Sequence, residues 1–276
     1  MSNGLNISLK SYDSIFQNDE QRNTEEIKPV PISELKPFTE QPFKVKLDED
    51  MDALVESIKQ CGVLTPVIAR PHKDGGYEIL SGHRRVKACE LAGITDIPVV
   101  VKNLDDDTAT ILLVDSNLQR EHILPSEKAF AYQMTLEAMK RKAGRPEKEN
   151  FVQIGQNKSP YNSRQELSEQ TGESSVQIQR YIRLTNLIDP ILDMVDNNQI
   201  AMNAAVEISY LGSKEQAAVM QSIEKEETSP SIAQARKMRQ FHQEGKLSDT
   251  VIESIMMEQK PETVKITLGE DKLKKY

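Results

Sequence analysis

Hydrophobic and polar positions change their spacing twice along the chain, and each change marks a different kind of structure. Residues 1–28 are polar with scattered apolar residues and no sustained period, which predicts a flexible arm. From residue 29 to residue 120, short apolar runs alternate with segments of helical period, a pattern that predicts one compact α+β unit. From residue 125 onward only the helical period recurs, so we expect an all-helical region to follow.

The α+β unit is expected to contain short strands and amphipathic helices in alternation. The strands are predicted at residues 30–32, 66–70, 77–80 and 97–101, the first being an edge strand because proline is tolerated there. The helices are predicted at residues 48–60, 86–92 and 107–115. Asp48 is the predicted N-cap of the first helix, while Gly62 and Gly93 end the first two. Residues 33–38 predict a turn and residues 39–43 a loop.

In the all-helical region, Ser126 follows a proline and is the expected N-cap of a helix that runs to about residue 143. One face of this helix carries Ala129, Tyr132, Leu136 and Met139. Residues 144–162 are rich in Gly, Pro, Asn, Gln and Lys and are expected to form an exposed linker. Further helices are predicted at residues 190–195, 202–210, 215–223 and 247–257 and from residue 228, and residues 264–268 fit a strand.

Residues 163–184 have the pattern of a helix-turn-helix. Ser163 and Glu166 form a predicted capping box, Gly172 supplies the bend, and Leu167 and Ser168 are expected to pack under the turn. The second helix is anchored by Ile178, Tyr181 and Ile182. The remaining side chains face outward as a polar set that suits base edges and phosphates. The predicted DNA-contacting residues are Arg164, Gln165, Ser174, Ser175, Val176, Gln177 and Arg180. The alternative is a plain helical hairpin with the same glycine.

A second candidate site lies in residues 75–88 of the α+β unit. Two glycines set up a hairpin, a short apolar strand follows, and Ser81-Gly82 makes a tight turn into a helix with Arg84 and Arg85 in its first turn. Free N–H groups at a helix start and two guanidinium groups form a natural seat for phosphate. An ordinary surface turn with solvated arginines is an equally good interpretation of these residues alone.

Composition and charge narrow the function classes. The chain has 276 residues, a net charge of −8, 28% charged and 5% aromatic residues and no Trp, which favours several small units with thin cores. The negative charge argues against a generally basic nucleic-acid coat but not against local DNA contacts. Cys61 and Cys89 fit no metal spacing, so free thiols in a reducing compartment are expected. There is no signal peptide and no bilayer-spanning apolar run, so we expect a cytoplasmic protein without a membrane partner.

With both sites in view, the chain resembles a ParB-type partition protein, or a close relative carried on a plasmid or mobile element. The matching pieces occur in order between residues 28 and 211, about two thirds of the chain. They are the Gln41-Pro42 loop, residues 62–67, the strand and turn at residues 77–85, Asn117-Leu118-Gln119-Arg120, Leu124-Pro125 with the following helix, and the helix-turn-helix.

The resemblance implies a ParB/sulfiredoxin-like nucleotide-binding domain at residues 29–124 and a helix-turn-helix DNA-binding domain at residues 125–228. Residues 229–276 would be a short C-terminal helical or oligomerisation segment. In such proteins CTP with Mg²⁺ makes two N-terminal domains engage, so that a dimer loaded at a parS-like site becomes a clamp on DNA. The implied partner is a ParA-type ATPase, contacted through residues 1–28, and the implied location is the nucleoid or a plasmid.

Carried over to this sequence, Gly82, Arg84 and Arg85 would hold the triphosphate, Asn117 would lie near the metal, and Arg120 would close the site. The nucleotide set is completed by Gln41, Ser81, His83 and Ser116. His83 and Ser116 stand where the family has acids and Phe43 where it has arginine, so CTP hydrolysis is left open. The C-terminus is also shorter than the usual dimerisation domain.

Two alternatives from other classes remain. Free-serine kinases and sulfiredoxin resemble the same N-terminal fold, and their phosphate turn is similar to Gly82-His83-Arg84. A kinase needs a catalytic acid, for which Glu78 is the nearby candidate, and sulfiredoxin needs a reactive cysteine closer to the turn than Cys89. A transcription regulator that uses its N-terminal domain only to dimerise is the other alternative.

Overall fold

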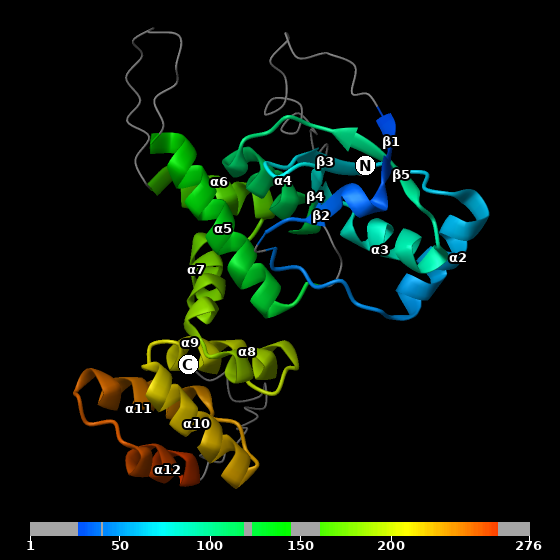
Figure 1. Cartoon of the computed structure of the whole chain (residues 1–276). Coiled ribbons are helices and arrows are strands. Elements are labelled where there is room, and N and C mark those ends of the chain that lie inside the picture. Colours follow the sequence, from blue (N-terminus) through cyan, green and yellow to red (C-terminus); the bar gives the residue numbers. More distant parts are fainter. Residues whose placement is uncertain (1–26, 40, 119–122, 145–160, 259–276) are drawn as a thin grey trace, which may run out of the picture. The chain divides into compact units, whose positions relative to one another are not determined.

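The computed structural model describes residues 27–39, 41–118, 123–144 and 161–258 (Figure 1). Its contacts divide the chain into two compact units. The N-terminal unit comprises residues 1–121 and 134–158, and the helical unit comprises residues 122–133 and 159–276. Helix α5 (Pro125–Gly144) therefore belongs to the helical unit in its first part and to the N-terminal unit in its second.

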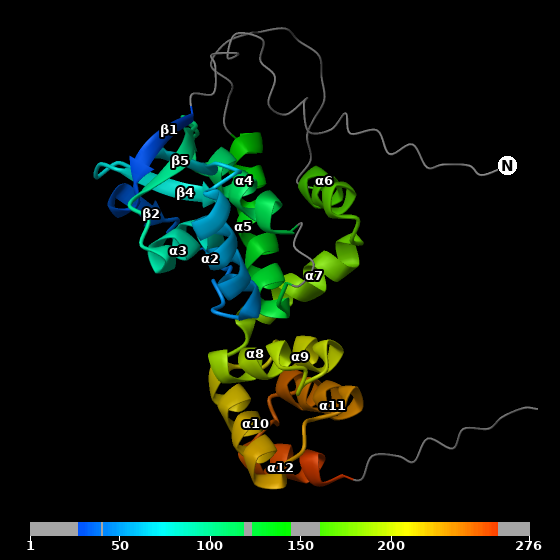
Figure 2. The same cartoon turned by 90° about the vertical axis from the view of Figure 1, so that its right-hand side faces the viewer.

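The N-terminal unit is built on a mixed sheet of five strands in the order β1-β5-β3-β4-β2 (Figures 1 and 2). The strands are β1 (Ile27–Pro31), β2 (Leu35–Pro37), β3 (Val67–Pro71), β4 (Tyr77–Ser81) and β5 (Asp96–Val101). β1 and β5 are antiparallel, as are β3 and β4, whereas β3 with β5 and β2 with β4 are parallel. The predicted edge strand is confirmed, because β1 lies at one end of the sheet.

The other edge strand, β2, is where the sequence prediction was wrong. Residues 33–38 were expected to form a turn, but a short 3-10 helix (Ile32–Glu34) leads directly into β2. β2 pairs with β4 through the register Leu35↔Tyr77, a partner more than 40 residues away. A strand of three residues that ends in proline has no local pattern to distinguish it from a turn.

Besides the second part of α5 and the 3-10 helix, the described residues of the N-terminal unit form the α-helices α2 (Glu49–Cys61), α3 (His83–Ala92) and α4 (Asp106–Leu118). The Asp48 carboxylate caps α2 by accepting the Met51 N–H, and Gly62 and Gly93 follow α2 and α3 with positive φ, as predicted. α2 and α3 pack together and bury one face of the sheet, whereas α4 packs on β4. Consecutive residues of β4 consequently enter different cores, Ile79 with α2 and α3 and Leu80 with α4.

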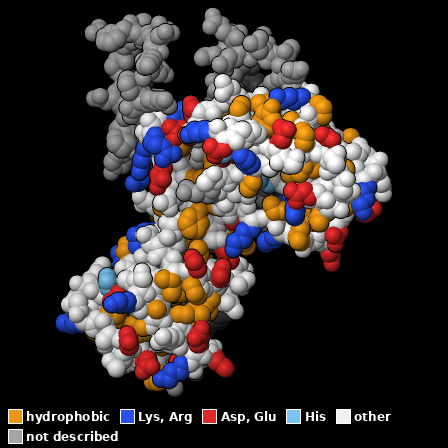
Figure 3. Space-filling view, in the orientation of Figure 1, with side chains coloured by type: hydrophobic (Ala, Val, Ile, Leu, Met, Phe, Trp, Pro, Cys, Tyr) orange, Lys and Arg blue, Asp and Glu red, His pale blue; other side chains and the backbone are white. Residues whose placement is uncertain are grey.

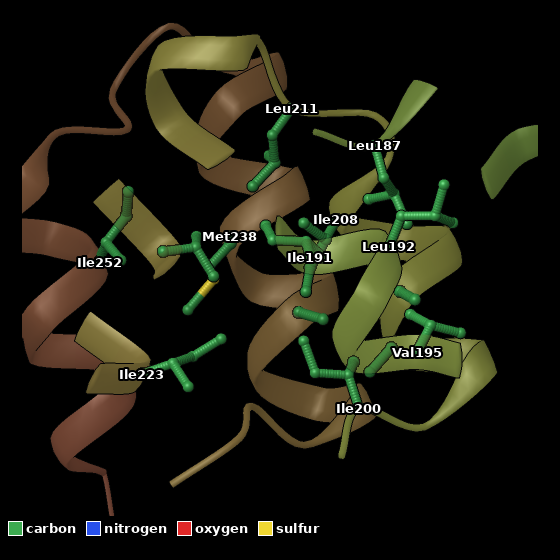
Figure 4. Close-up of a cluster of buried hydrophobic side chains, with 14 of the residues drawn as sticks. Leu187, Ile191, Leu192, Val195, Ile200, Ile208, Leu211, Ile223, Met238 and Ile252 are labelled. Carbon is green, nitrogen blue, oxygen red and sulfur yellow. The ribbon is translucent and has the colours of Figure 1, made fainter. Parts of the chain in front are cut away.

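The helical unit is formed by α6 (Tyr161–Thr171), α7 (Ser175–Arg183), α8 (Asp189–Asp196), α9 (Met202–Ile208), α10 (Ser213–Glu226), α11 (Ile232–Gln243) and α12 (Asp249–Met257). Its core is apolar and contains side chains from α8 through α12 (Figure 4). Met238 of α11 and Ile252 of α12 belong to the same cluster as Ile191 and Ile208. Helices on both sides of residue 228 therefore share one core, and the structure draws no boundary there.

Two predicted helix caps in this unit were wrong. Ser126 lies inside α5, and its Oγ donates to the Asp196 carboxylate (2.5 Å) rather than capping its own helix, because proline at the first position lets the helix begin one residue earlier. Ser163 is buried inside α6, which begins at Tyr161, so it forms no capping box with Glu166. The predicted strand at 264–268, most of the predicted linker at 144–162 and residues 1–26 of the predicted arm at 1–28 lie outside the described residues. Ile27 and Lys28, the last two residues of that arm, lie in β1, so the end of the arm was predicted wrongly.

Candidate nucleotide and DNA sites

The turn between β4 and α3 is shaped by Gly82. This residue has φ +103°, and a Cβ atom added to it would lie 3.0 Å from Val67 Cγ2 and 3.3 Å from the Arg85 guanidinium carbon. β4 also carries a bulge just before the turn, since Ser81 pairs with Ile68 while Ile79 pairs with Ala69. The position therefore requires glycine both for its backbone angles and for space.

The first turn of α3 has the features of an anion site. It contains no acidic residue, and its N-cap, Gly82, supplies no side chain to the free backbone N–H groups. Those N–H groups and the helix dipole favour a negative charge at this end. The turn thus has the strand-to-helix geometry on which the prediction of a phosphate seat rests, and phosphate binding stays a prediction.

Arg85 connects this turn to an adjacent pocket. Its Nη1 donates to the carbonyl oxygens of Thr65 (2.5 Å) and Pro66 (2.7 Å), so the side chain is held against the loop that follows α2. Burial lowers the pKa of the Arg85 guanidinium from its ordinary value, against an opposing effect of Cys89. The pocket has a volume of about 290 Å³, and its lining is Leu54, Ser57, Gly62, Val63, Leu64, Thr65 and Arg85.

The loop at residues 62–65 is a part of this candidate site that the predicted residue set missed. These residues belong to the stretch that carries the ParB resemblance, and that was the one feature of the sequence able to point to them. The loop supplies the Thr65 carbonyl oxygen that Arg85 binds, and a search by residue type does not detect a backbone group. A nucleotide base or sugar is the kind of group that a small pocket beside a phosphate seat accommodates.

The neighbours of Arg85 in the first turn differ in exposure. The Arg84 side chain is 32% exposed, and its Nη2 lies 3.2 Å from Asp48 Oδ1, the same oxygen that caps α2. His83 is buried. Arg84 is therefore a charged residue of this turn that reaches solvent, whereas His83 is enclosed in the unit.

The end of α4 brings Ser116 and Asn117 into the unit without forming an acidic metal site. Ser116 Oγ and Asn117 Nδ2 both donate to the Leu113 carbonyl, at 2.9 Å and 2.7 Å, and Asn117 is buried. Within the described ranges no group of three or more His, Cys, Asp or Glu side chains is arranged to hold a metal ion. These residues do not by themselves fit a protein-built Mg²⁺ site, which usually includes a carboxylate. Gln41 is half-buried in its loop, and Arg120 lies outside the described residues.

Glu78, the candidate acid of the kinase alternative, is already engaged. Only 4% of Glu78 is exposed, and its Oε2 accepts hydrogen bonds from Arg70 Nε (2.7 Å) and Nη2 (2.6 Å). Its Oε1 accepts the Thr39 backbone N–H at 3.3 Å. A carboxylate fixed in this way holds β3, β4 and the loop after β2 together and is poorly suited to take a proton from a substrate.

The helix-turn-helix is confirmed at residues 161–183. Gly172 has φ +72° at the bend, Leu167 is buried beneath it, and Ser168 Oγ donates to the Glu173 carbonyl at 2.6 Å. Ser174 caps α7 by accepting the Gln177 N–H. The turn is therefore held by its own side chains, as the sequence pattern predicts.

The outward face of α7 carries the predicted DNA-contacting residues. Val176 is 61% exposed and Arg180 is exposed, while Ile178 on the opposite face is fully buried. Gln177 is half-buried and its Nε2 lies 3.5 Å from Met202 Sδ, which places the start of α9 beside it. Arg164 and Gln165 are exposed on α6, Ser174 is exposed and Ser175 half-buried. This is the arrangement of a recognition helix with one anchored and one free face.

Comparisons with known proteins match both regions of the chain that contain the candidate sites. Residues 16–118 match the family model of the ParB N-terminal domain, and residues 158–244 match that of the ParB HTH domain. A nucleoid occlusion protein of Geobacillus sp. (strain WCH70) is 37% identical over 119 residues, 43% of this chain and 42% of the relative. A probable chromosome-partitioning protein ParB of Neisseria meningitidis serogroup A is 29% identical over 198 residues, 71% of this chain and 62% of the relative. The matches thus span less than two thirds of these relatives.

Two solved structures of a C-terminally truncated ParB from Caulobacter crescentus are similar at low identity. The complex with the centromeric parS site has 22% identity and a TM-score of 0.44, covering 83% of this chain and 98% of that one. The complex with CTP-gamma-S has 24% identity and a TM-score of 0.33, covering 72% and 98%. These likenesses are too distant to transfer residue roles. None of the helices in the described ranges has the length and apolarity needed to span a bilayer.

Proposed function

We propose, from the premise that the chain belongs to the ParB family, that it is a sequence-specific DNA-binding partition protein whose N-terminal unit is gated by CTP. The observation that carries the DNA-binding part is the ordered turn before α7 together with the free outer face of that helix. Base contacts are assigned to Gln177, Ser175, Val176 and Arg180, and a phosphate contact to Arg164. The target is a double-stranded parS-like site, bound by a homodimer.

CTP is assigned to the turn at Gly82 and the pocket beside it. The backbone N–H groups of the α3 start, Arg84 and Arg85 would hold the triphosphate, and the loop at residues 62–65 would face the nucleoside. The bound nucleotide supplies the charge and surface that allow two N-terminal units to engage and close a clamp on DNA. A ParA-type ATPase is the proposed motor partner, and the nucleoid or a plasmid is the proposed location.

Mg²⁺ is assigned to the nucleotide rather than to a protein-built site. Triphosphates bring the ion with them, and Asn117 is the polar residue at the end of α4 proposed to lie near it. Because Ser116 offers a hydroxyl that is bonded to its own helix, no hydrolytic step is assigned to this chain. Ser116→Glu is the variant that asks whether a missing acid limits CTP turnover, and an unchanged turnover would exclude that role for the position.

The first test is calorimetric titration of the full chain with CTP, ATP and GTP, with magnesium present. Selective CTP binding is expected, and Arg84→Ala should abolish it while leaving DNA binding intact, because Arg84 lies in the N-terminal unit. Lys87→Ala is the matched control, since Lys87 lies on the same helix and pairs with Glu90 at 2.8 Å. Unchanged nucleotide affinity in Arg84→Ala would overturn the assignment of the phosphate seat.

The same titration separates the proposal from its alternatives. Selective ATP binding would favour the kinase class, although the bonds made by Glu78 count against it. No binding of any nucleotide would leave a helix-turn-helix regulator whose N-terminal unit serves as a scaffold.

A further inference from the structure

Glu173 occupies a critical place in the helix-turn-helix, directly before the Ser174 N-cap of α7. Its backbone carbonyl is fixed by Ser168 of α6. Its side chain forms an ion pair outside α6 and α7, with Lys128 of α5. The distance between Glu173 Oε1 and Lys128 Nζ is 2.7 Å. The turn that orients the recognition helix is therefore held from α6 through the backbone and from α5 through an ion pair.

This ion pair is part of a partly buried cluster. The Lys128 and Glu173 side chains are 25% and 22% exposed, and Lys128 Nζ lies 5.2 Å from the ring centroid of Tyr181, on α7 itself. Tyr181 packs edge-to-face on the buried Tyr132 of α5, with ring centroids 5.8 Å apart. Burial and then the neighbouring Glu173 carboxylate raise the pKa of the Tyr132 hydroxyl above its ordinary value. Lys128 thus contacts both the turn before α7 and the body of α7.

The segment that carries Lys128 is itself held to the helical unit. Asp196, at the end of α8, accepts the Ser126 backbone N–H at 2.9 Å and the Ser126 hydroxyl at 2.5 Å. An acceptor from another helix thereby satisfies the start of α5. Lys128, two residues further along, is presented from a fixed position, so its ammonium group can define where Glu173 and Tyr181 lie.

We propose that Lys128 is a positioning residue for DNA recognition, acting through Glu173 and Tyr181 to set the orientation of α7. This inference rests on the proposed DNA-binding function and adds a residue outside the helix-turn-helix to it. Lys128 touches no DNA in this proposal. Contacts to bases depend on the orientation of α7 more than contacts to the phosphate backbone do. Removing the Lys128 ammonium group should therefore weaken the base contacts more than the phosphate contacts.

The test compares full-chain variants on duplexes selected from a random-sequence pool by the wild-type protein and on scrambled duplexes of the same composition. Lys128→Met should lower affinity for the selected duplex about tenfold, the size expected for losing one charge-assisted hydrogen bond, and leave affinity for the scrambled duplex nearly unchanged. Lys128→Arg should retain the preference. The double variant Lys128→Glu with Glu173→Lys should restore most of it, since the pair is re-formed with its charges exchanged.

Lys225→Met is the matched control, because Lys225 also forms an ion pair in the helical unit (Lys225 Nζ to Glu253 Oε1, 3.0 Å) but lies away from α7. Thermal unfolding measured for every variant identifies a loss of fold, and Glu173→Gln provides a second route to break the pair. A selected-to-scrambled ratio that is unchanged in Lys128→Met, or equal losses on both duplexes, would overturn the inference. A wild-type chain that selects no sequence would instead overturn the proposed DNA function, and this inference with it.

Discussion

The two units build their recognition surfaces in different ways. In the N-terminal unit the proposed binding turn is the connection between β4 and α3, so Gly82 and Arg85 belong to the proposed site and also join the sheet to its helix. In the helical unit the proposed recognition face lies on one side of α7, and Ile178 anchors the other side. Fold and site share residues in the first unit and are separated onto opposite faces of one helix in the second.

The buried polar groups show the same difference. The N-terminal unit uses charge, since Arg70 joins Glu78 of β4 to Asp106 at the start of α4. The core of the helical unit also contains two buried neutral amides, those of Gln216 and Gln234. Gln216 Nε2 donates to the Asn186 and Leu211 carbonyls, and Gln234 Nε2 donates to the Ile255 carbonyl. The bonds of Arg70 therefore depend on charge, whereas those of Gln216 and Gln234 do not.

The two units do not differ in surface charge as they do in their buried polar groups. On the face that Figure 3 shows, basic and acidic side chains are interspersed over the described residues of both. With a net charge of −8, the chain has no overall attraction for a polyanion. Nucleotide and DNA binding must accordingly depend on where individual groups are placed, which makes single substitutions informative.

The largest effect is expected for Gly82→Ala. The new Cβ would meet Val67 and the Arg85 guanidinium, and alanine is strained at φ +103°, so we expect a stability loss of about 1–3 kcal/mol together with loss of nucleotide binding. Gly93→Ala is the matched control, because Gly93 has φ +75° and nothing within 4 Å of its added Cβ. Nucleotide titration and chemical unfolding of both variants measure the difference. Normal CTP binding by Gly82→Ala would show that the turn is not part of the site.

The features that the sequence predicted correctly are those whose partners lie nearby in the chain. Asp48 caps α2 through Met51, three residues on, and Gly172 needs only its own φ angle to make the bend. Helix caps and glycine bends depend on residues a few positions apart, so the sequence alone predicts them. The Gly82 turn belongs to the same class, since a strand, a glycine and a helix start are contiguous.

The features that the sequence could not reveal depend on distant partners. Ser126 has the form of an N-cap, but its hydroxyl binds Asp196, 70 residues away. Lys128 and Glu173 are 45 residues apart, and an isolated lysine on a helix is indistinguishable from any solvated one. The pocket loop at residues 62–65 is joined to α3 through the Thr65 carbonyl and Arg85, 20 residues away, and residue types do not report a backbone contact. In each case tertiary packing decides the outcome.

Arg180→Ala and Gln177→Ala test the outer face of α7 in the helical unit. If the face of α7 is separate from the core, each should weaken binding to the selected duplex by about 1–3 kcal/mol and leave thermal unfolding unchanged. Fluorescence anisotropy on selected and scrambled duplexes measures this. An equal loss on both duplexes would identify the residue as a phosphate contact, and a lower unfolding temperature would show that the face is not independent of the fold.

Ser174→Ala should have a smaller effect, and it should lower both the stability of the chain and its affinity for DNA. Ser174 Oγ accepts the Gln177 N–H at 3.2 Å, and loss of an N-cap costs about 1 kcal/mol. Ser248→Ala is the matched control, since Ser248 caps α12 through the Val251 N–H at 3.4 Å. Both variants should unfold at similarly reduced denaturant concentrations, but only Ser174→Ala should weaken DNA binding. Equal DNA affinities would mean that the start of α7 does not contribute to recognition.

The smallest effect concerns the charged network of the N-terminal unit. The side-chain hydrogen bond from Arg70 lowers the pKa of Asp106 below its ordinary value of 3.8. A carboxylate with a lowered folded-state pKa stabilises the fold above its unfolded-state pKa, and the contribution is lost as the pH falls through the folded-state pKa. Asp106 is 68% exposed, so solvent limits this contribution to a few tenths of a kcal/mol. Asp106→Asn should therefore destabilise the chain slightly at pH 7, and the difference from wild type should shrink as the pH falls through the lowered pKa of Asp106. Asp74→Asn, on the exposed hairpin turn, is the control. Urea unfolding at several pH values measures the free energy of unfolding of each variant. If the difference between Asp106→Asn and wild type does not shrink as the pH falls, charge is not what holds α4 to β3.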